Sequence, residues 1–412
     1  MQFDPAIVRK MFPALAQDSI YLDNPGGTQI AQSSLDRIVR YLIEMNANHG
    51  GAFPTAEASD AMLAEAHAAA ADFLGARSPD EVAFGANMTT LTFAASRALG
   101  LLLQPGDEIV VTRLDHDANI SPWLRVAQDR GCKVRWVDFN PADCTLDLAD
   151  LRSALAERPR LVAFGYASNA VGTINPAAEI IQMAHDAGAL VYVDAVQFAP
   201  HGLIDVQQLG CDFLACSAYK FFGPHVGLLY GKYDLLDQLN AYKVRPAPQL
   251  PPGKFETGTQ NHEGIAGVLG AIEYLVWLGE TFGGAAQGSS RRESLSQAMR
   301  AIHQSELALS QALIETLQSM KGVKVYGITD LNRLDQRVPT VSFTVEGFTP
   351  RQVAGHLGKA KINVWDGNFY ALAVTERLGL EGSGGLVRVG ATHYNTLEEI
   401  EAFGRVLGEL VR

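Results

Sequence analysis

From residue 81 onward, short apolar runs alternate with longer stretches that have the residue spacing of amphipathic helices. The apolar runs are rich in Val, Leu, Phe and Tyr, which favours strands. Strand and helix in alternation predict right-handed crossovers and a mainly parallel sheet covered by helices on both faces. The runs that carry this prediction are EVAFG, EIVVT, KVRWVDF, LVAFGYAS and LVYVDAV.

Two further apolar runs, DFLACSAYK and VGLLYG, follow each other too closely for a crossover helix between them. One of the two is therefore expected to run antiparallel. With them the sheet has seven strands, and we predict a large α/β domain over residues 21–280. The Gly- and Ser-rich stretch at 281–290 interrupts the pattern and predicts a surface loop or hinge.

The remaining residues predict a second, smaller α+β domain made of 1–20 and 291–412. A long helix over about 293–320 comes first, and strands at VKVYG and TVSFTV follow it. A helix near 350–358, a strand at INVWD and a terminal helix at 396–410 complete the pattern. A chain of 412 residues also fits two domains better than one.

Composition excludes several classes of function. The net charge is −12, and an acidic surface disfavours non-specific binding to nucleic acid or to anionic membranes. No apolar stretch approaches the roughly 20 residues that span a bilayer, and the start of the chain does not resemble a signal peptide. The four cysteines form no Cys-x-x-Cys pair, so neither a zinc site nor a disulfide framework is expected. A cytoplasmic enzyme fits these features.

Two residues at predicted strand ends indicate the main chemistry. Asp194 ends an apolar run, which places its carboxylate where open α/β sheets bind ligands. Lys220 follows 26 residues later, and a lysine in an apolar pocket has a lowered pKa and attacks carbonyls. An amine for the aldehyde and an anion for the pyridine nitrogen are what pyridoxal 5′-phosphate (PLP) requires. The pair therefore favours a PLP site.

Two other segments give weaker signals. FGANMTTLTF predicts a strand–loop–helix junction, where free backbone N–H groups and the hydroxyls of Thr89 and Thr90 would hold a phosphate. LDHDANISPW places His116 after a strand, as a flat ring able to lie on another ring. Taken singly, all four features are more often helix caps, solvated side chains or loop residues. Their shared position at strand ends is what favours a cofactor site.

These segments resemble the class V aminotransferase group of fold-type I PLP enzymes, and most of all the SUF-type cysteine desulfurases. The resemblance runs from YLDNPGG at 21 to HYNTLEEI at 400, nearly the whole chain. It implies the PLP-dependent transferase fold of type I, PLP as cofactor and a homodimer. The shared phrases are DHDANISPW, SNAVGTINP, VDAVQ, DFLACSAYKFFGP, FETGTQN and the closing RVGATHYNT.

The resemblance also implies roles for individual positions. Lys220 would carry PLP as a Schiff base, Asp194 would pair with the pyridine nitrogen and His116 would stack on the ring, as the catalytic residues. Arg388 would bind the substrate α-carboxylate through a bidentate contact, with a surface salt bridge as the alternative. Asn169 would lie near the cofactor's phenolic oxygen and the substrate, and Gln197 would bond that oxygen. The remaining cofactor ligands would be Met88, Thr89 and Ser217, with Thr259 from the other subunit, and no metal is expected.

One loop departs from the desulfurase pattern. The desulfurases carry a G-H-H-C-A-Q-like segment whose cysteine takes sulfur as a persulfide, whereas this chain has VWDGNFYALAV. Tyr370 stands at the cysteine position, Asn368 and Phe369 replace the two histidines, and Trp365 replaces a basic residue. All four cysteines lie between 132 and 216, in the large domain, and Cys211 and Cys216, which flank a predicted strand, are best interpreted as small buried residues. Without a thiolate in the loop, persulfide formation has no acceptor.

A second departure is Tyr219, directly before the lysine, where the desulfurases usually have His. A tyrosine there resembles the kynureninases of the same class. Its role stays open among a phosphate ligand, an acid–base group and a packing residue.

The expected function is therefore that of a PLP enzyme acting on a small α-amino acid, by C–S lyase (β-elimination) chemistry rather than persulfide formation. Transamination or epimerisation is the alternative, because the same cofactor chemistry serves all three. A non-catalytic, partner-binding subunit is disfavoured because the cofactor residues are all present. A Rossmann dehydrogenase is disfavoured because no G-x-G-x-x-G follows an early strand.

Overall fold

The computed structural model describes residues 3–286 and 288–411. Its main sheet has seven strands in the order β2-β8-β7-β6-β5-β3-β4. The five strands from β7 to β4 run parallel, and β8 runs antiparallel to β7 and β2. The predicted seven-stranded sheet with its antiparallel strand is thus confirmed. Its strands are β2 (Val82–Gly85), β3 (Glu108–Thr112), β4 (Lys133–Val137), β5 (Leu161–Gly165), β6 (Leu190–Asp194), β7 (Phe213–Ser217) and β8 (Gly227–Gly231).

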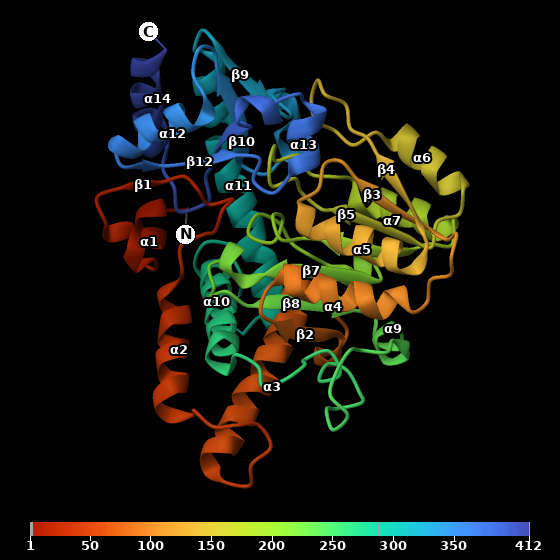
Figure 1. Ribbon diagram of the computed structural model, residues 1–412. Helices are drawn as coiled ribbons and strands as arrows, with labels where there is room; N and C mark the ends of the chain where they lie inside the picture. The colour runs from red at the N-terminus through yellow and green to blue at the C-terminus, as the bar shows by residue number, and fades with distance from the viewer. Residues whose placement is uncertain (1–2, 287, 412) are drawn as a thin grey trace.

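Helices cover both faces of this sheet. One face packs against α4 (Met88–Gly100) and α5 (Ser121–Arg130), which lie in front of it in Figure 1. The other packs against α3 (Pro54–Leu74), α6 (Leu148–Ala156), α7 (Ala177–Asp186) and α10 (His262–Thr281). On β3, Ile109 and Val111 pack on the face covered by α4 and α5, whereas Val110 packs on the opposite face. The side chains alternate in this way because successive strand residues point to opposite sides of a sheet.

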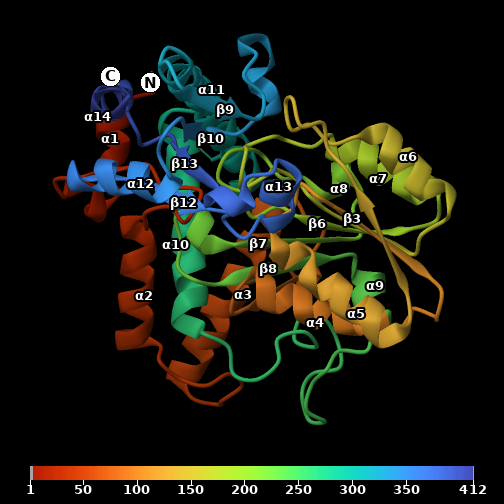
Figure 2. The same cartoon turned by 45° about the horizontal axis from the view of Figure 1, so that its top comes forward.

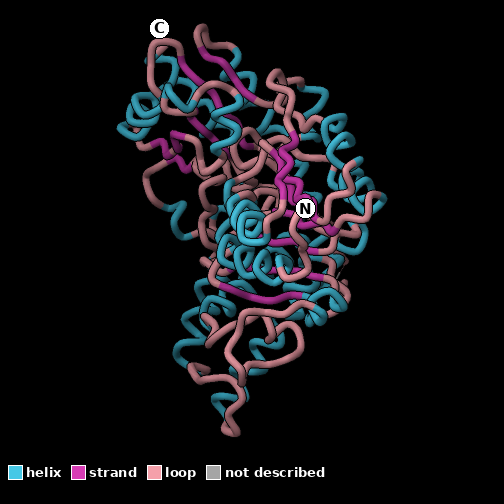
Figure 3. The backbone as a smooth tube through the Cα atoms, turned by 45° about the vertical axis from the view of Figure 1, so that its right-hand side comes forward, coloured by secondary structure: helices cyan, strands magenta, loops and turns pink. Residues whose placement is uncertain are grey.

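A second sheet is antiparallel and has the order β12-β13-β10-β9. It shares an apolar core with helices α11 (Arg291–Gln318), α12 (Pro350–Lys359) and α14 (Leu397–Leu410), and it lies above the main sheet in Figure 3. The predicted strand INVWD is interrupted: β11 (Ile362–Asn363) leaves this sheet and pairs with β1 (Ile20–Tyr21). The four strands of the sheet are β9 (Val323–Tyr326), β10 (Thr340–Val345), β12 (Trp365–Gly367) and β13 (Leu386–Gly390).

The N-terminal segment contacts both halves of the molecule. Helix α1 (Pro5–Arg9) is followed by Phe12, whose ring packs on Phe222 and Tyr274 of the large core. Arg9 instead donates to the carbonyl of Tyr394, next to α14. The segment 282–290 connects α10 to α11. The domain boundaries at 20 and 280 stay a prediction.

Helix α2 (Gln32–Glu44) lies at the edge of the molecule against α10, where Ser33 and Ser34 donate to the carbonyls of Gly270 and Gly267 (Figures 1 and 2). Within the described residues, no helix has both the length and the apolar character needed to cross a membrane. The remaining helices are α8 (Val206–Leu209), α9 (Tyr233–Gln238) and α13 (Leu372–Arg377), with 3-10 turns at 13–16, 79–81, 117–119, 218–220, 331–336 and 381–383.

Candidate active site

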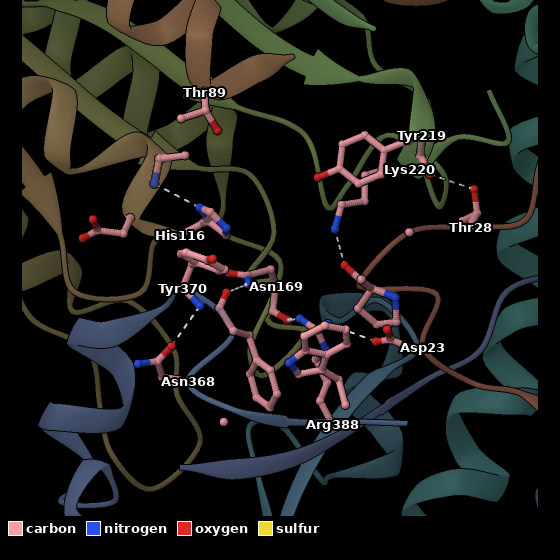
Figure 4. A pocket seen from close by; sticks show the side chains of 18 of the residues that line it. Asp23, Thr28, Thr89, His116, Asn169, Tyr219, Lys220, Asn368, Tyr370 and Arg388 are labelled. Atoms are coloured by element: carbon pink, nitrogen blue, oxygen red, sulfur yellow. Dashed lines mark hydrogen bonds and ion pairs between the residues drawn. The ribbon is translucent and has the colours of Figure 1, made fainter. Parts of the chain in front are cut away.

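Two adjoining cavities open at the C-terminal ends of β5, β6 and β7. The inner cavity, of about 510 Å³, reaches from Asp194 to the N-terminus of α4. The outer cavity, of about 1300 Å³, is bounded by the 21–30 segment and by the loop 365–370. Thr89, His116, Asn169, Tyr219 and Lys220 line both of them. Figure 4 shows Thr89 and Arg388 toward opposite ends of the site, with Lys220 and His116 between them.

Lys220 lies in the turn that follows β7, and it is buried. Its Nζ donates a hydrogen bond to the carbonyl of Pro25 and lies 5.1 Å from the centre of the Tyr219 ring. Burial, followed by the positive charge of Arg388, lowers the pKa of Lys220 to about 7. A large share of the amine is therefore neutral and nucleophilic near neutral pH.

Asp194 is the last residue of β6 and points into the inner cavity. Its Oδ1 accepts a hydrogen bond of 2.9 Å from the backbone N–H of Val196, and burial raises the pKa of the carboxyl to about 6. Gln197 lies on the same turn, where its Nε2 donates to Thr340 and its Oε1 has no partner among the described residues. The unpaired amide oxygen indicates that a hydrogen-bonding group is to be bound here.

The N-terminus of α4 closes the other end of the inner cavity. Asn87 caps the helix by accepting from the N–H of Thr90, and Met88 donates its N–H to Oγ of Ser217, 2.9 Å away. Thr89 is exposed in the first turn and lines both cavities. Free N–H groups and the helix dipole make such a terminus suitable for a phosphate.

His116 lies between the cavities with a fixed ring orientation. Its Nδ1 accepts a hydrogen bond of 3.0 Å from the N–H of Ala118, so a neutral ring carries its proton on Nε2. Burial, with the charges of Lys220 and Arg388, lowers the pKa of His116 to about 4. The imidazole is therefore neutral at physiological pH. The ring of Tyr370 stacks on it with 5.6 Å between centres and an interplanar angle of 22°.

Arg388, on β13, is buried rather than part of a surface salt bridge. Its Nη2 pairs with Oδ1 of Asp23 at 3.2 Å, and its Nη1 donates to the carbonyl of Asn169 at 3.0 Å. The guanidinium carbon lies 4.4 Å from the centre of the Phe369 ring. Nε of Arg388 and Oδ1 of Asn169 have no partners among the described residues, so both side chains keep capacity for a ligand.

The loop that differs from the desulfurase pattern lies at the mouth of the outer cavity. Phe369 and Tyr370 both have a φ of 57°, a strained conformation for non-glycine residues that is typical of functional sites. The carbonyl of Phe369 accepts from Asn169, and that of Tyr370 accepts from the N–H of Asp117. Trp365 is exposed beside them. These contacts hold the loop against the site.

The cysteines lie elsewhere. Cys144, Cys211 and Cys216 are buried, Cys132 is partly exposed, and no cysteine lines either cavity in the part of the chain that the structure describes. Burial raises the pKa of the Cys211 thiol to about 12 and that of Cys216 further. Cys216 is on β7, but it packs in the core on the side of α3 and α10. None of these thiols is placed to accept sulfur from a substrate in the cavities.

The structure brings together all the predicted site residues except one. Thr259 is exposed and lines neither cavity of its own chain, whereas Met88, Ser217 and Gln197 line the inner one. Sequence reasoning missed Asp23, Pro25, His225 and the support that Phe369 gives to Arg388. Asp23 and Pro25 lie in YLDNPGG, and the resemblance of this segment to the family is the one feature of the sequence that could have indicated them.

Comparison with known proteins agrees with this geometry. The family model Aminotransferase class-V matches residues 20–403. The chain belongs to the class-V aminotransferase family. The predicted family, fold type and PLP dependence are thereby confirmed, and this member of the class-V aminotransferase family is a PLP-dependent enzyme.

Three proteins illustrate how similar known members of the family are. The aminotransferase-like protein FGM3 of Gibberella zeae is 38% identical over 96% of this chain and 95% of its own length. A probable cysteine desulfurase of Mycolicibacterium paratuberculosis is 32% identical over 98% of this chain, which spans 58% of that protein. The apo structure of a cysteine desulfurase from Thermococcus onnurineus superposes with a TM-score of 0.89 at 30% identity, over 100% of this chain and 98% of that one.

The residues present fit the cofactor. A buried amine of lowered pKa, a buried carboxylate and a helix N-terminus line one cavity, as the aldehyde, the pyridine nitrogen and the phosphate of PLP require. The unpaired oxygens of Gln197 and Asn169 can bond polar groups at the edge of the ring.

Proposed function

We propose that this enzyme is a C–S lyase that eliminates sulfur from the β-carbon of a small α-amino acid such as cysteine. The observation that carries the proposal is the position of Tyr370: it stacks on His116 at the mouth of the site, where the desulfurases have their sulfur-accepting cysteine. A phenol, with an ordinary pKa of about 10, cannot take a sulfur atom as a thiolate does. Sulfur then has to leave the site as sulfide.

In this proposal the inner cavity holds the cofactor. Lys220 would bind it covalently, Asp194 would bond the pyridine nitrogen, and His116 would stack on the ring. The hydroxyls of Thr89 and Ser217 would hold the phosphate, and Met88, whose N–H donates to Oγ of Ser217, would orient that serine. The phenolic O–H would donate to the unpaired Oε1 of Gln197, and Asn169 would lie near the same oxygen.

The outer cavity binds the amino acid. Arg388 would receive the α-carboxylate through its unpaired Nε, beside its contact with Asp23, and Asn169 would lie near the substrate. A substrate held there would lie between Lys220 and Tyr370, which both line the outer cavity. The loop 365–370 limits the access of water to the reacting carbon.

When bound, PLP supplies an electron sink that stabilises negative charge at the substrate α-carbon. Once the amino group of the substrate has displaced the Lys220 amine from the cofactor, that amine, whose pKa burial lowers to about 7, would take the proton from the α-carbon. Asp194, held by the N–H of Val196, keeps its negative charge beside the ring. The Cβ–S bond breaks with its electron pair on sulfur, and with water the products from cysteine are pyruvate, ammonia and hydrogen sulfide.

The experiment is product analysis with cysteine. Holoenzyme is incubated with cysteine, and sulfide, pyruvate, ammonia and alanine are quantified alongside the intact mass of the chain. We expect pyruvate and ammonia in equal amounts, with little alanine and no adduct. Stoichiometric alanine with an adduct of about 32 Da, one sulfur atom, on any cysteine would overturn the proposal.

A variant with Tyr370→Phe is the matched control. It keeps the ring on His116 and removes the hydroxyl, so the ratio of pyruvate to alanine should not change if the hydroxyl does no chemistry. Transamination or epimerisation remains the alternative activity. A screen of amino acids that records α-keto acid, racemised substrate and sulfide separates the three.

We further propose a cytoplasmic homodimer in which Thr259 of each subunit completes the phosphate site of the other. Thr259 is exposed and lies outside its own cavities, which supports this arrangement. Large apolar side chains are exposed on α2, on the segment before α3 and on the loop after α9, where a second subunit would cover them. They are Val39, Leu42, Ile43, Phe53, Tyr242, Val244 and Leu250.

A further inference from the structure

A histidine lies at the end of the inner cavity near the N-terminus of α4, and it has no role in the proposed function. His225 lies between Pro224 and β8, is exposed, and lines both cavities. Its ring stacks on that of Tyr219, with 4.9 Å between centres and an interplanar angle of 16°. Tyr219 is the residue that stands where the desulfurases usually have a histidine.

The backbone holds His225 close to the N-terminus of α4. A Cβ on Gly227 would lie 2.4 Å from the carbonyl carbon of Asn87, so only glycine lets β8 approach the helix cap this closely. The paired residue on β7 is Ser217, whose Oγ accepts from the N–H of Met88. His225, two residues before Gly227, is thus carried on a segment fixed against the same helix terminus and the same serine.

A phosphate at this place needs a cation. A phosphate ester carries about −1.5 to −2 charges near pH 7, whereas a helix N-terminus supplies about half a positive charge. Among the described residues that line the inner cavity, only Lys220, His116 and His225 can be cationic. Lys220 is committed to the aldehyde in the proposed function, and His116 is half-buried and neutral.

We propose that His225, stacked on Tyr219 at the wall of the inner cavity, is the cationic ligand of the cofactor phosphate. The proposal rests on the proposed function, in which α4 and Ser217 hold that phosphate. His225 is exposed at the wall of the cavity, so its ring can contact an anion that binds there. Tyr219 then serves as a flat support that fixes the imidazole.

The test compares two ligands that differ only in the phosphate. Apoenzyme is titrated with PLP and with pyridoxal, and the dissociation constants are measured by quenching of protein fluorescence. In His225→Asn, the dissociation constant for PLP should rise about 10- to 100-fold, the loss of one charge-assisted hydrogen bond, while that for pyridoxal should change less than about twofold. His225→Lys should restore part of the affinity for PLP because it restores a cation.

Controls separate this role from a structural one. His303→Asn changes a histidine on α11 that lines neither of the two cavities, and it should leave both constants unchanged. Equal weakening of PLP and pyridoxal in His225→Asn, or no weakening of either, would overturn the proposal. So would a loss of PLP affinity in Tyr219→Phe with none in His225→Asn, which would assign the phosphate to the phenol.

Failure of the underlying scheme has a different signature. If the wild-type chain bound PLP no more tightly than pyridoxal, α4 and Ser217 would not hold a phosphate, and the proposal for His225 would fail with them. Circular dichroism of every variant checks that a lost affinity does not come from misfolding.

Discussion

Arg388 and Asp23 form a buried ion pair between two segments 365 residues apart, with 3.2 Å between Nη2 and Oδ1. The pair ties the 21–30 segment to β13 at the substrate end of the site. Burial raises the pKa of Asp23, and the positive charge of Arg388 opposes that shift. The carboxylate therefore keeps its charge in an apolar place largely because the guanidinium is beside it.

Replacing Asp23 by Asn should destabilise the fold. The variant leaves Arg388 buried without a counter-ion, and the removal of one partner from a buried pair typically costs about 3–5 kcal/mol. The free energy of unfolding in urea, measured on holoenzyme, tests this. Asp18→Asn is the control, since Asp18 pairs with Lys361 at the surface and should give no measurable change. An Asp23→Asn chain as stable as wild type would show that Arg388 finds another partner.

Lys220→Ala should abolish covalent attachment of the cofactor. Borohydride reduces the link between an amine and an aldehyde, so treated wild-type protein should carry cofactor on the peptide that contains Lys220, and the variant should carry none. Peptide mass spectrometry after reduction makes the measurement. Lys232→Ala, which removes an amine paired with Asp212 outside both cavities, should label as wild type does. Label on any other lysine would refute the assignment.

Asp194→Asn should retain PLP and lose turnover. The pyridine nitrogen loses the anion that keeps it protonated, and a lost buried charge pair corresponds to a decrease in kcat of about 100-fold or more. The absorbance of the bound cofactor and kcat are measured on the same preparation, so that loss of cofactor cannot be mistaken for loss of chemistry. Near-normal kcat would mean that another group holds the ring.

The sheet and the residues at its strand ends could be predicted from the sequence because they follow local rules. Alternating strands and helices define a parallel sheet, and the carboxyl ends of its strands meet at one edge, which brings Asp194, Ser217 and Lys220 together. Motif resemblance added Arg388 and Asn169, which lie on segments that no local pattern relates.

The contacts of the 21–30 segment and of the loop 365–370 could not be predicted in this way. Asp23 reaches Arg388, and Phe369 reaches Asn169, only because the two sheets pack together in three dimensions. The left-handed backbone at Phe369 and Tyr370 also has no sequence signal, since neither residue favours a positive φ. No pattern in the sequence indicated His225, and its place beside the site is recognised from the stacking of its ring on Tyr219.

His393 should make the stability of the enzyme fall in acid. Its ring is buried, with Nε2 bonded to the hydroxyl of Tyr274 and Nδ1 without a partner among the described residues. Burial, together with the nearby His201, lowers the pKa of His393 to about 3. An unfolded chain has a histidine pKa of about 6.5, so below that pH the unfolded state binds a proton that the folded state does not.

The stability that His393 contributes is therefore complete above pH 6.5 and is lost as the pH falls toward 3. Between pH 6.5 and 5, the wild type should lose about 2 kcal/mol more than His393→Gln. Urea unfolding of both proteins at about pH 6.5 and about pH 5 gives the change in the free energy of unfolding for each. The comparison of these two changes does not depend on how stable the variant is at the start. Parallel pH dependences would show that the buried ring is protonated in the folded state.

Mixing two inactive variants should restore activity if each site uses Thr259 from the partner subunit. Thr259→Glu places a carboxylate against the proposed phosphate, and Lys220→Ala removes the amine, so each homodimer should be inactive. In a mixed dimer, one site has both defects, while the other has Lys220 from one chain and Thr259 from the other. Random exchange makes half of the dimers mixed with one intact site each, so roughly a quarter of all sites should be active.

Activity after unfolding and refolding the two variants together, compared with each refolded alone, measures this. If the two homodimers are inactive and the mixture is inactive as well, although native mass spectrometry shows mixed dimers, then Thr259 serves the site of its own chain or neither site.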